Sequence, residues 1–462
     1  MGCDMWNAVE MKWDRPTVLM ADVANLSGQF SVWYSGNWAK RFHVSEWNQG
    51  GDSLSWSIES GFSGNVNVTA LIKGDGAEVQ LSTGHPIAKI RSGEQKLTKS
   101  ISTNWNRVDL GIIHLKAGIN TVTLSSSRPG GGLELYSLEL VSPDIRLCLE
   151  KQAVEMRSDT SWMRESKYGL QFHWTSESQP RYGKQKVYAD AVRAFDVQSF
   201  AQMVNQTGAG YIIFTTSHAE HYFPAPIKSI DAIMPGRTSD RDLVQDLIGA
   251  LGAYGIRLML YYHVGHDHWV EPDGWWTRTG FAPDNPNVFI SNWCVIMTEI
   301  GERYGEGLAG WFYDDGCVYY PLNPDFRQLG QAAKAGNSSR VICYNPWIWP
   351  RFTDFQDYFC GEGYSFLKND EWLPGNGSGI FTDGPHKSLQ AHTNFILEKS
   401  WCHSTPAIPI PPPQIPKDEF LQDMVNAIKR GIVPSVNLEI YQNGSCSDVS
   451  TDYMRAIKAT LT

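Results

Sequence analysis

The chain of 462 residues lacks the features that would place it in a membrane or on nucleic acid. No run of about 18 apolar residues occurs, so no membrane span is predicted. The first residues show no basic stretch followed by an apolar one, so no signal peptide is recognised. Lys and Arg total 39 against 49 Asp and Glu, and the net charge of −10 argues against nucleic-acid binding, which needs a basic surface.

Cysteine pairs with metal-ligand spacing are also missing. None of the eight cysteines forms a CxxC pair, so no structural zinc site is expected, and these residues are either buried thiols or a few disulfides. No cofactor is predicted, and a structural Ca²⁺ in the N-terminal domain is left open. Six Asn-x-Ser/Thr sequons would be used only in a eukaryotic secretory setting. We expect an extracellular or periplasmic location, secreted or surface-anchored.

Aromatic residues, in contrast, are abundant: 18 are Trp, and aromatics make up 12% of the chain. Exposed rings suit sugar binding because a ring face and the C–H face of a pyranose are both apolar, although part of the excess is expected in the core. The hydrophobic content of 42% supports large cores, and the length suits two domains.

After an N-terminal extension (1–16), residues 17–142 predict an antiparallel β-sandwich. Short segments of period-2 alternation, such as NVNVTALIKG and LELYSLELV, are separated by Gly, Pro and Ser turns. The stretch from Trp105 to Val141 resembles the last strands of galactose-binding-like carbohydrate-binding modules. A glycan-binding role and a purely structural role both stay open. The aromatics that form either a sugar platform or core are Trp33, Tyr34, Trp38, Trp47, Trp56 and Trp105.

After a linker (143–160), residues 161–462 predict a (β/α)8 TIM barrel, because apolar runs alternate with amphipathic helical patterns. Helical faces occur within 197–204, 243–251 and 420–428, and the proline-rich segment 405–416 predicts an extended loop. The eight predicted strands begin at Lys167, Tyr211, Arg257, Leu308, Val341, Tyr358, Phe395 and Val433.

The fourth of these strands ends in Asp314, Asp315 and Gly316. In a (β/α)8 barrel the carboxyl ends of the strands form the catalytic face, so an acidic residue there points to chemistry. The alternative is that both aspartates only shape the next turn. Strand alternation lets one of the two point into the barrel mouth, so they are not expected to act as a pair.

Several motifs of the barrel together resemble the α-L-fucosidases of glycoside hydrolase family 29. KYGLQFHW is similar to the family's first strand, and the segments ending in YIIFTTSH and RLMLYY are similar to its second and third strands. FLQDMVNAIKRGIVPSVNLEI is similar to its last helix and strand. The resemblance covers about residues 160–460. It implies sugar-binding roles for His173 and His218 and makes Asp314 the nucleophile, with Asp315 as the alternative.

The sequence also departs from the family. The adjacent His-His pair becomes His218-Ala219, which removes one imidazole unless His221 replaces it. Ser400-Trp401 aligns with the family's Ser-Trp, but the position expected for the acid/base falls near His392 and not on a glutamate. The usual C-terminal β-sandwich is missing, and a β-domain precedes the barrel instead. These departures affect which sugar is expected as the substrate and which residue is expected as the acid/base.

For the acid/base we compare glutamates expected at strand ends. Glu362 is the first choice, because it lies between two glycines that would let a substrate approach the backbone. Glu439 and then Glu220 are the alternatives, and Glu398 is expected within a strand. The residues predicted to line the sugar site are His173, Trp174, His218, His221, Tyr262, His263, Trp311, Asn345 and Trp401, with Trp347 beside Asn345. A zinc site at His263, His266 and His268 lacks a recognised ligand signature, so no metal is predicted.

The sequence therefore predicts an exo-acting glycoside hydrolase, α-L-fucosidase-like, that removes a terminal α-linked L-fucose from an oligo- or polysaccharide with retention. The alternatives are a different sugar, such as α-galactose or a modified deoxy sugar, or a non-catalytic carbohydrate-binding protein on a decayed barrel. The oligomeric state is not predicted.

Overall fold

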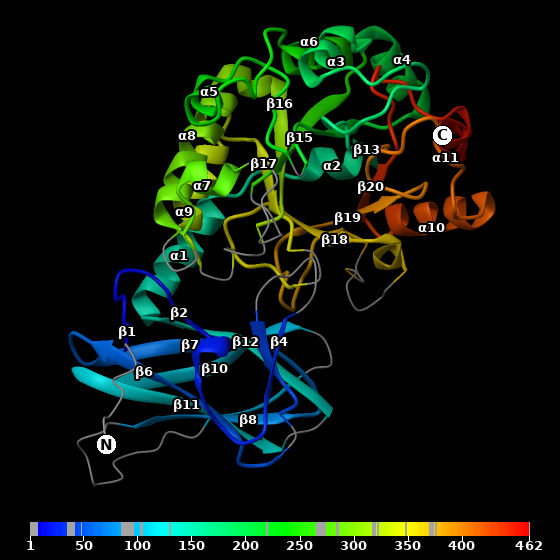
Figure 1. Ribbon diagram of the computed structural model, residues 1–462. Coiled ribbons are helices and arrows are strands. Elements are labelled where there is room, and N and C mark those ends of the chain that lie inside the picture. Colours follow the sequence, from blue (N-terminus) through cyan, green and yellow to red (C-terminus); the bar gives the residue numbers. More distant parts are fainter. Residues whose placement is uncertain are drawn as a thin grey trace. The chain divides into compact units, whose positions relative to one another are not determined.

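The computed structural model describes residues 8–34, 42–47, 49–84, 97–101, 105–128, 131–218, 220–264, 274–282, 286–316, 320, 323–346, 349–368, 374 and 377–461. The chain divides into two compact units. The first is Met1–Glu155 with two short segments, Cys317–Asn323 and Ile348–Phe352, and the second is the rest of the chain. Figure 1 shows the strands of the first unit in blue and cyan, and those of the second from green to red.

The first unit is a β-sandwich of two six-stranded sheets. One sheet has the order β1-β6-β11-β8-β9, with β3 beside β6, and the other has the order β10-β7-β12-β5-β4, with β2 beside β12. All pairs are antiparallel except the two-residue β1, which pairs in parallel with β6. The strands are β1 (Val9–Glu10), β2 (Thr17–Met20), β3 (Asn25–Ser27), β4 (Ser31–Tyr34), β5 (Phe42–Ser45), β6 (Ser53–Ser60), β7 (Gly64–Asp75), β8 (Glu78–Gly84), β9 (Leu97–Ser100), β10 (Asn106–Leu115), β11 (Gly118–Arg128) and β12 (Gly131–Val141).

Alternate residues of these strands fill the core of the sandwich, as the period-2 pattern predicts. Trp47 and Trp56 are members of this core, with 0% and 3% of their surface exposed, and Trp105 is buried as well. These three tryptophans therefore provide no surface platform for a sugar. Trp38 and the side chains of Trp33 and Tyr34 lie outside the described residues.

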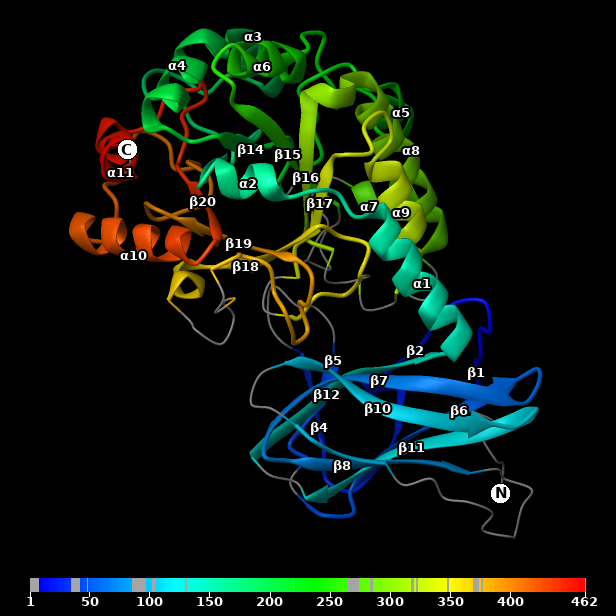
Figure 2. The same ribbon diagram turned by 180° about the vertical axis from the view of Figure 1, so that it is seen from behind.

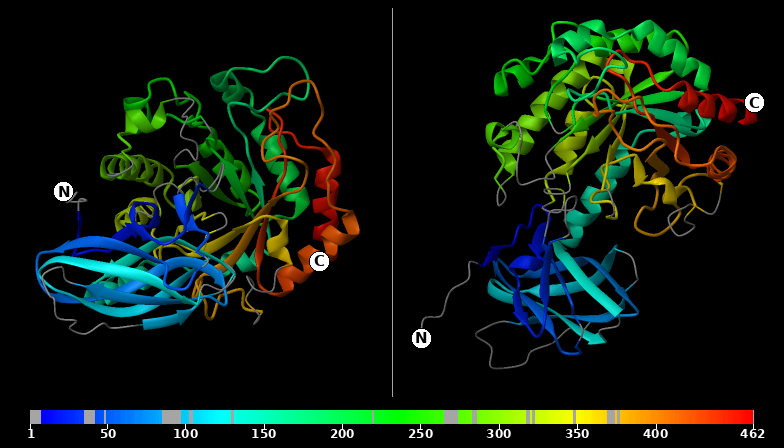
Figure 3. Two further views of the ribbon diagram at one scale, coloured as in Figure 1. Left: turned by 60° about the horizontal axis from the view of Figure 1, so that its bottom comes forward. Right: turned by 45° about the vertical axis from the view of Figure 1, so that its right-hand side comes forward.

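The second unit contains an eight-stranded parallel sheet, curved into a barrel with its helices outside it (Figures 2 and 3). The strand order is β17-β16-β15-β14-β13-β20-β19-β18. This confirms the predicted barrel. The strands are β13 (Gly169–Phe172), β14 (Tyr211–Thr215), β15 (Arg257–His263), β16 (Leu308–Asp314), β17 (Val341–Tyr344), β18 (Tyr358–Glu362), β19 (Gln390–Ile396) and β20 (Val433–Asn437).

The three predicted amphipathic helices are present as α4, α6 and α10, and the segment 405–416 contains neither helix nor strand. Helix α1 includes most of the stretch predicted as a linker. The helices are α1 (Pro143–Met156), α2 (Ser161–Glu165), α3 (Tyr188–Ala194), α4 (Val197–Thr207), α5 (Lys228–Ile233), α6 (Leu243–Gly252), α7 (Trp275–Thr279), α8 (Asn287–Tyr304), α9 (Phe326–Ala333), α10 (Lys417–Lys429) and α11 (Asp448–Leu461).

The seventh barrel strand was predicted too late in the chain. β19 runs from Gln390 to Ile396, so Glu398 follows the strand and does not lie within it. The prediction is wrong because the inward positions of β19 are polar, which hides the apolar run of a buried strand. His392 bonds the hydroxyl of Ser435 at 2.8 Å, and Asn394 donates to Gln171 at 3.2 Å. The barrel interior thus satisfies these polar groups.

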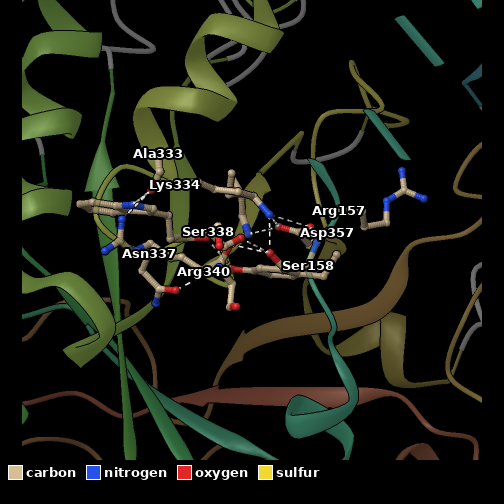
Figure 4. A network of polar contacts seen from close by, with 12 residues as sticks. Arg157, Ser158, Ala333, Lys334, Asn337, Ser338, Arg340 and Asp357 are labelled. Atoms are coloured by element: carbon tan, nitrogen blue, oxygen red, sulfur yellow. Dashed lines mark hydrogen bonds and ion pairs between the residues drawn. The ribbon is translucent and has the colours of Figure 1, made fainter. Parts of the chain in front are cut away.

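Among the described strands, the ladder does not close between β17 and β18, which leaves a seam there. Asp357, just before β18, bridges this seam. Its backbone N–H donates to the carbonyl of Ile342 at 2.9 Å, and its Oδ2 accepts from the backbone N–H of Ile342 at 2.7 Å. Asp357 also pairs with Lys334, at 3.1 Å, and accepts from the backbone N–H of Ser158, at 2.6 Å (Figure 4). A carboxylate therefore replaces ladder hydrogen bonds at this point.

The six cysteines in the described part of the chain are free thiols; Cys148 is exposed and the others are buried. This outcome favours the first of the two sequence-based alternatives for these six. Among the described residues, no helix is both long and apolar enough to span a membrane.

Candidate active site

Three neighbouring strands bring polar side chains to the carboxyl end of the barrel: β16 ends at Asp314, Asn345 follows β17, and β18 ends at Glu362. On β16, Phe312 belongs to the cluster that fills the barrel, and Asp314 lies two residues further on the same face. The apolar interior thus ends at an acidic rim, as the sequence of β16 predicts.

The side chain of Asn345 joins the two carboxylates. Its Nδ2 donates to Asp314 Oδ1 at 2.8 Å and to Glu362 Oε2 at 2.8 Å. Since each oxygen lies 2.8 Å from the same nitrogen, the two oxygens are separated by at most twice that distance. Retaining glycosidases hold their two carboxyl groups about 5–5.5 Å apart. Both carboxylates are half-buried, so a substrate can reach them.

Two glycines flank Glu362, and each has its own structural reason. A Cβ at Gly361 would lie 2.3 Å from the ring of Phe366, so only glycine fits there. Gly363 has φ of 115°, a backbone conformation that residues with a side chain rarely adopt. The sequence-based interpretation, close approach of a substrate to the backbone, is therefore not needed: Gly361 leaves room for the ring of Phe366, and Gly363 allows the chain to turn after β18.

Tyr261 on β15 belongs to the site, although the sequence analysis selected its neighbour Tyr262. Burial, followed by the nearby carboxylates of Asp314, Asp315 and Glu362, raises the pKa of Tyr261 well above its ordinary value. The phenol therefore keeps its proton and can act as a hydrogen-bond donor. Strand alternation carried the signal, because Tyr261 shares a face with His263 and Tyr262 does not.

The imidazoles of His173 and His218 lie side by side, with ring centres 5.4 Å apart. Burial, followed by the charge of the neighbouring imidazole, lowers the pKa of His173 to about 3, while its hydrogen bond to Asn437 opposes this shift. Burial and the neighbouring His221 lower the pKa of His218 to about 4. Both rings are therefore neutral at pH 7 and can exchange hydrogen bonds with hydroxyl groups.

Trp401 lies next to this pair, with its ring centre 5.1 Å from that of His173. Asn437, at the end of β20, holds both residues. Its Oδ1 lies 2.8 Å from His173 Nδ1, and its Nδ2 donates to the carbonyl of Trp401 at 3.0 Å. The segment around Trp401 is therefore fixed relative to the first and last strands of the barrel.

The other predicted histidines lie nearby. The ring of His221 stacks on Trp275, at 4.3 Å and an angle of 6°, and its centre is 4.9 Å from that of His263. His263 ends β15, and its Nδ1 lies 2.7 Å from Oδ2 of Asp315. His266, His268 and Trp347 lie outside the described residues.

Three predicted aromatic residues point to the helix side of the sheet, away from this cluster. Trp174 packs against Tyr188 of α3 and donates to the carbonyl of Gln442. Trp311 donates to the carbonyl of Ala333 at the end of α9, and Tyr262 contacts the ring of Trp311. This placement corrects the interpretation of these residues as stacking walls: they pack the layer between strands and helices.

The two alternative glutamates do not join the Asp314 cluster. Glu220 accepts a hydrogen bond from the hydroxyl of Ser176, at 2.7 Å. Glu439 is only 3% exposed, and it is bound by His403, at 3.0 Å, and by the backbone N–H groups of Lys399 and Ser400. Glu439 therefore serves to hold the segment that leads to Trp401.

The buried carboxyl group of the neighbouring Glu398 should make the free energy of unfolding depend on pH. Burial, with a smaller effect of Glu439, raises the pKa of Glu398 to about 7 from 4.5. Between these two pH values the folded chain binds more protons than the unfolded chain, so the free energy of unfolding should fall by up to about 3 kcal/mol as the pH rises from 4.5 to 7.

Glu398→Gln, which keeps the shape and an acceptor oxygen, should flatten this dependence in urea denaturation at pH 5 and pH 8. The same change at the exposed Glu150 serves as the control and should leave the dependence unaltered. Equal slopes for Glu398→Gln and the wild type would contradict the assignment.

Among the described residues, no group of three or more His, Cys, Asp or Glu side chains is arranged to hold a metal ion. The chemistry available at this face is that of carboxylates, neutral imidazoles, an amide and a phenol. A (β/α)8 barrel with a close carboxylate pair at the carboxyl ends of its strands is the arrangement of a glycoside hydrolase.

Comparison with known proteins agrees with this class. A family model described as alpha-L-fucosidase matches residues 182–369, which include β14 to β18 and both carboxylates. This part of the barrel is thus similar to the α-L-fucosidase family, as the motifs predict.

Among solved structures, the α-L-fucosidase AlfC from Lactobacillus casei in complex with α-L-fucose is 16% identical. That match covers 65% of this chain and 97% of the other, with a TM-score of 0.45. An α-L-fucosidase from Bacteroides thetaiotaomicron is 15% identical, with coverage of 66% and 74% and a TM-score of 0.48. A comparison with curated proteins finds no match.

Proposed function

We propose that this protein removes a terminal α-linked L-fucose, or a fucose-like sugar, from glycans by a retaining double displacement. The observation that carries the proposal is the bridge of Asn345 between Asp314 and Glu362. It keeps one oxygen of each half-buried carboxylate within twice 2.8 Å of the other, an upper limit compatible with the separation of about 5–5.5 Å in retaining enzymes.

In this mechanism Asp314 attacks the anomeric carbon while Glu362, protonated, donates its proton to the departing oxygen. The C–O bond to the leaving group breaks and a covalent glycosyl ester with Asp314 forms. Glu362, now ionised, then takes a proton from water, which attacks the same carbon and releases Asp314. Asn345 donates to both carboxylates and thereby fixes their relative orientation.

The sugar would be held by the neutral imidazoles of His173 and His218, which suit hydroxyl groups because neither carries a charge that needs to be solvated. Trp401, held beside His173 by Asn437, offers an apolar face for the C–H side of the ring. Tyr261 adds a neutral donor close to the two carboxylates. The matched family supports the proposed substrate class, and the pair of carboxylates supports the proposed reaction.

The test is release of 4-nitrophenol from the aryl α-L-fucoside, with the α-galactoside and other aryl glycosides in parallel. Proton NMR of the first minutes of reaction should show α-L-fucose before the β anomer appears by mutarotation. An initial β anomer would contradict retention. Turnover of another glycoside alone would keep the mechanism and change the sugar, and no binding or turnover of any of them would contradict the proposal.

A further inference from the structure

Asp315 has a different partner from the adjacent Asp314. Its φ of 61° is in the left-handed region, so the chain turns immediately after β16 and the side chain leaves the alternation of the strand. Its Oδ2 lies 2.7 Å from Nδ1 of His263, whereas Asp314 accepts from Asn345. The side chain of Asp315 is only 11% exposed. The two neighbouring carboxylates therefore serve different groups.

His263 lies among the polar residues of the barrel mouth. It is the strand neighbour of Asp314 in the sheet register, and it lies on the same inward face of β15 as Tyr261. Its ring centre is 5.7 Å from that of His218 and 4.9 Å from that of His221. His263 is thus close to His218 and two residues from Tyr261, both of which contact the sugar in the proposed function.

We propose that Asp315 is a positioning residue that holds the imidazole of His263 by its Nδ1, so that Nε2 forms a hydrogen bond with one hydroxyl group of the bound sugar. With Nδ1 turned to the carboxylate of Asp315, Nε2 is the ring nitrogen on the opposite side, and either ring nitrogen of a histidine can form a hydrogen bond with a hydroxyl group. The inference rests on the proposed function and extends it, because it makes the Asp315–His263 pair a determinant of which sugar is selected.

The pair also separates the roles of the two aspartates. Asp314 is half-buried and shares Asn345 with Glu362, whereas Asp315 is nearly buried and lies 2.7 Å from His263. Loss of Asp315 should therefore weaken substrate binding and leave the chemical step to Asp314 and Glu362. Loss of Asp314 should do the opposite.

Two substitutions of Asp315 test this inference, because both tolerate the left-handed backbone. Asp315→Asn keeps an acceptor oxygen for His263, and Asp315→Gly removes it. We expect Asp315→Gly to raise KM for the aryl α-L-fucoside about tenfold, the usual effect of one lost hydrogen bond in a buried site, with a much smaller change in kcat. Asp315→Asn should have a KM within a few-fold of the wild type.

The decisive measurement uses the 2-deoxy, 3-deoxy and 4-deoxy analogues of the same fucoside. For the analogue that lacks the hydroxyl bound by His263, Asp315→Gly and the wild type should have equal KM, and the tenfold difference should persist for the other two. His263→Ala should show the same selective pattern, which keeps the test valid if Asp315→Gly fails to fold. The folded state of each variant is checked by circular dichroism.

An equal loss against all three analogues would overturn the inference and leave Asp315 with a structural role. So would a loss in Asp315→Asn as large as in Asp315→Gly, since the acceptor oxygen would then not matter. A wild-type protein that neither binds nor turns over the fucoside would refute the proposed function itself. This failure can be told apart from a failure of the inference about Asp315, because it is seen with the wild type before any variant is compared.

Discussion

Replacing Asp314 by asparagine should lower turnover of the aryl α-L-fucoside by on the order of 10⁴-fold or more, because the nucleophile is lost. An asparagine oxygen can still accept from Asn345, so the fold of the site should persist and the sugar should still bind. Steady-state release of 4-nitrophenol and calorimetric titration with the fucoside measure the two properties. Asp315→Asn is the matched control, because it makes the same change one residue away. Activity in Asp314→Asn that approaches the wild type would contradict the assignment.

Replacement of Glu362 should give a different kinetic pattern. The 4-nitrophenolate leaving group needs little acid assistance, so Glu362→Gln should form the glycosyl ester with Asp314 readily. Its hydrolysis should slow by about 10²- to 10⁴-fold, because no base activates water. A burst of 4-nitrophenol followed by a slow steady state is therefore expected, and azide, which needs no base, should accelerate that steady state.

The stereochemistry of the azide product assigns the two carboxylates. In Glu362→Gln the azide displaces Asp314 from the ester and should give the α-fucosyl azide. In Asp314→Gly it attacks the substrate directly and should give the β-fucosyl azide, since one displacement inverts the anomeric carbon. The reverse pattern would exchange the two roles, and a failure of azide to act on either variant would refute the pair.

The second large effect is expected on stability, at Arg340, where the chain enters β17. This guanidinium is fully buried, and its five N–H groups donate to five backbone carbonyls at 2.7–3.0 Å, none of them a carboxylate. The acceptors are the carbonyls of Gly301, Gly305, Leu308, Ala333 and Ala335. Arg340 thus joins the end of α8, the start of β16 and the end of α9.

Arg340→Met should lower the free energy of unfolding by about 3 kcal/mol. The loss is smaller than five hydrogen bonds suggest, because burial of the charge, which lowers the pKa of Arg340 to about 10, is relieved at the same time. Arg340→Lys should recover little, since an ammonium has three donors and cannot span the five acceptors.

Urea denaturation measures this effect, and Arg327→Met on the surface of α9 is the control. Arg327 is 46% exposed and lies 3.6 Å from Asp325, so its replacement should change stability by less than about 0.5 kcal/mol. An unchanged midpoint for Arg340→Met would show that the five carbonyls find other partners.

Much of the site was predictable because (β/α)8 barrels gather the ends of their strands on one face. Asp314 and Glu362 each follow a readable apolar run, and the topology alone brings such ends together. Tyr261 was missed although the sequence contains the information needed to choose it. Adjacent residues of a strand point to opposite faces, so Tyr261, two residues before His263, shares its face and Tyr262 does not. Trp311 was misjudged on the same ground, since it is an odd number of residues from Asp314.

Other features carried no local signal. β19 was placed five residues late because its inward side chains are polar, and their partners, such as Ser435 and Gln171, come from strands far away in the sequence. In the sequence, Glu439 and Glu362 both follow a predicted strand and are equally good candidates. Only the structure distinguishes them, because Glu439 is bound by His403 and two backbone N–H groups.

The sequence by itself determined the sandwich, the order of the barrel strands and the acidic end of β16, because these depend on periodicity and on residues adjacent in the chain. Tertiary structure alone decided that Asn345 joins Asp314 to Glu362, that Asp315 belongs to His263, and that Asp357 bridges the seam of the barrel. Each of these contacts is made by side chains whose partners come from a different strand. Their distance and direction are set by the curvature of the sheet, which no local pattern of residues encodes.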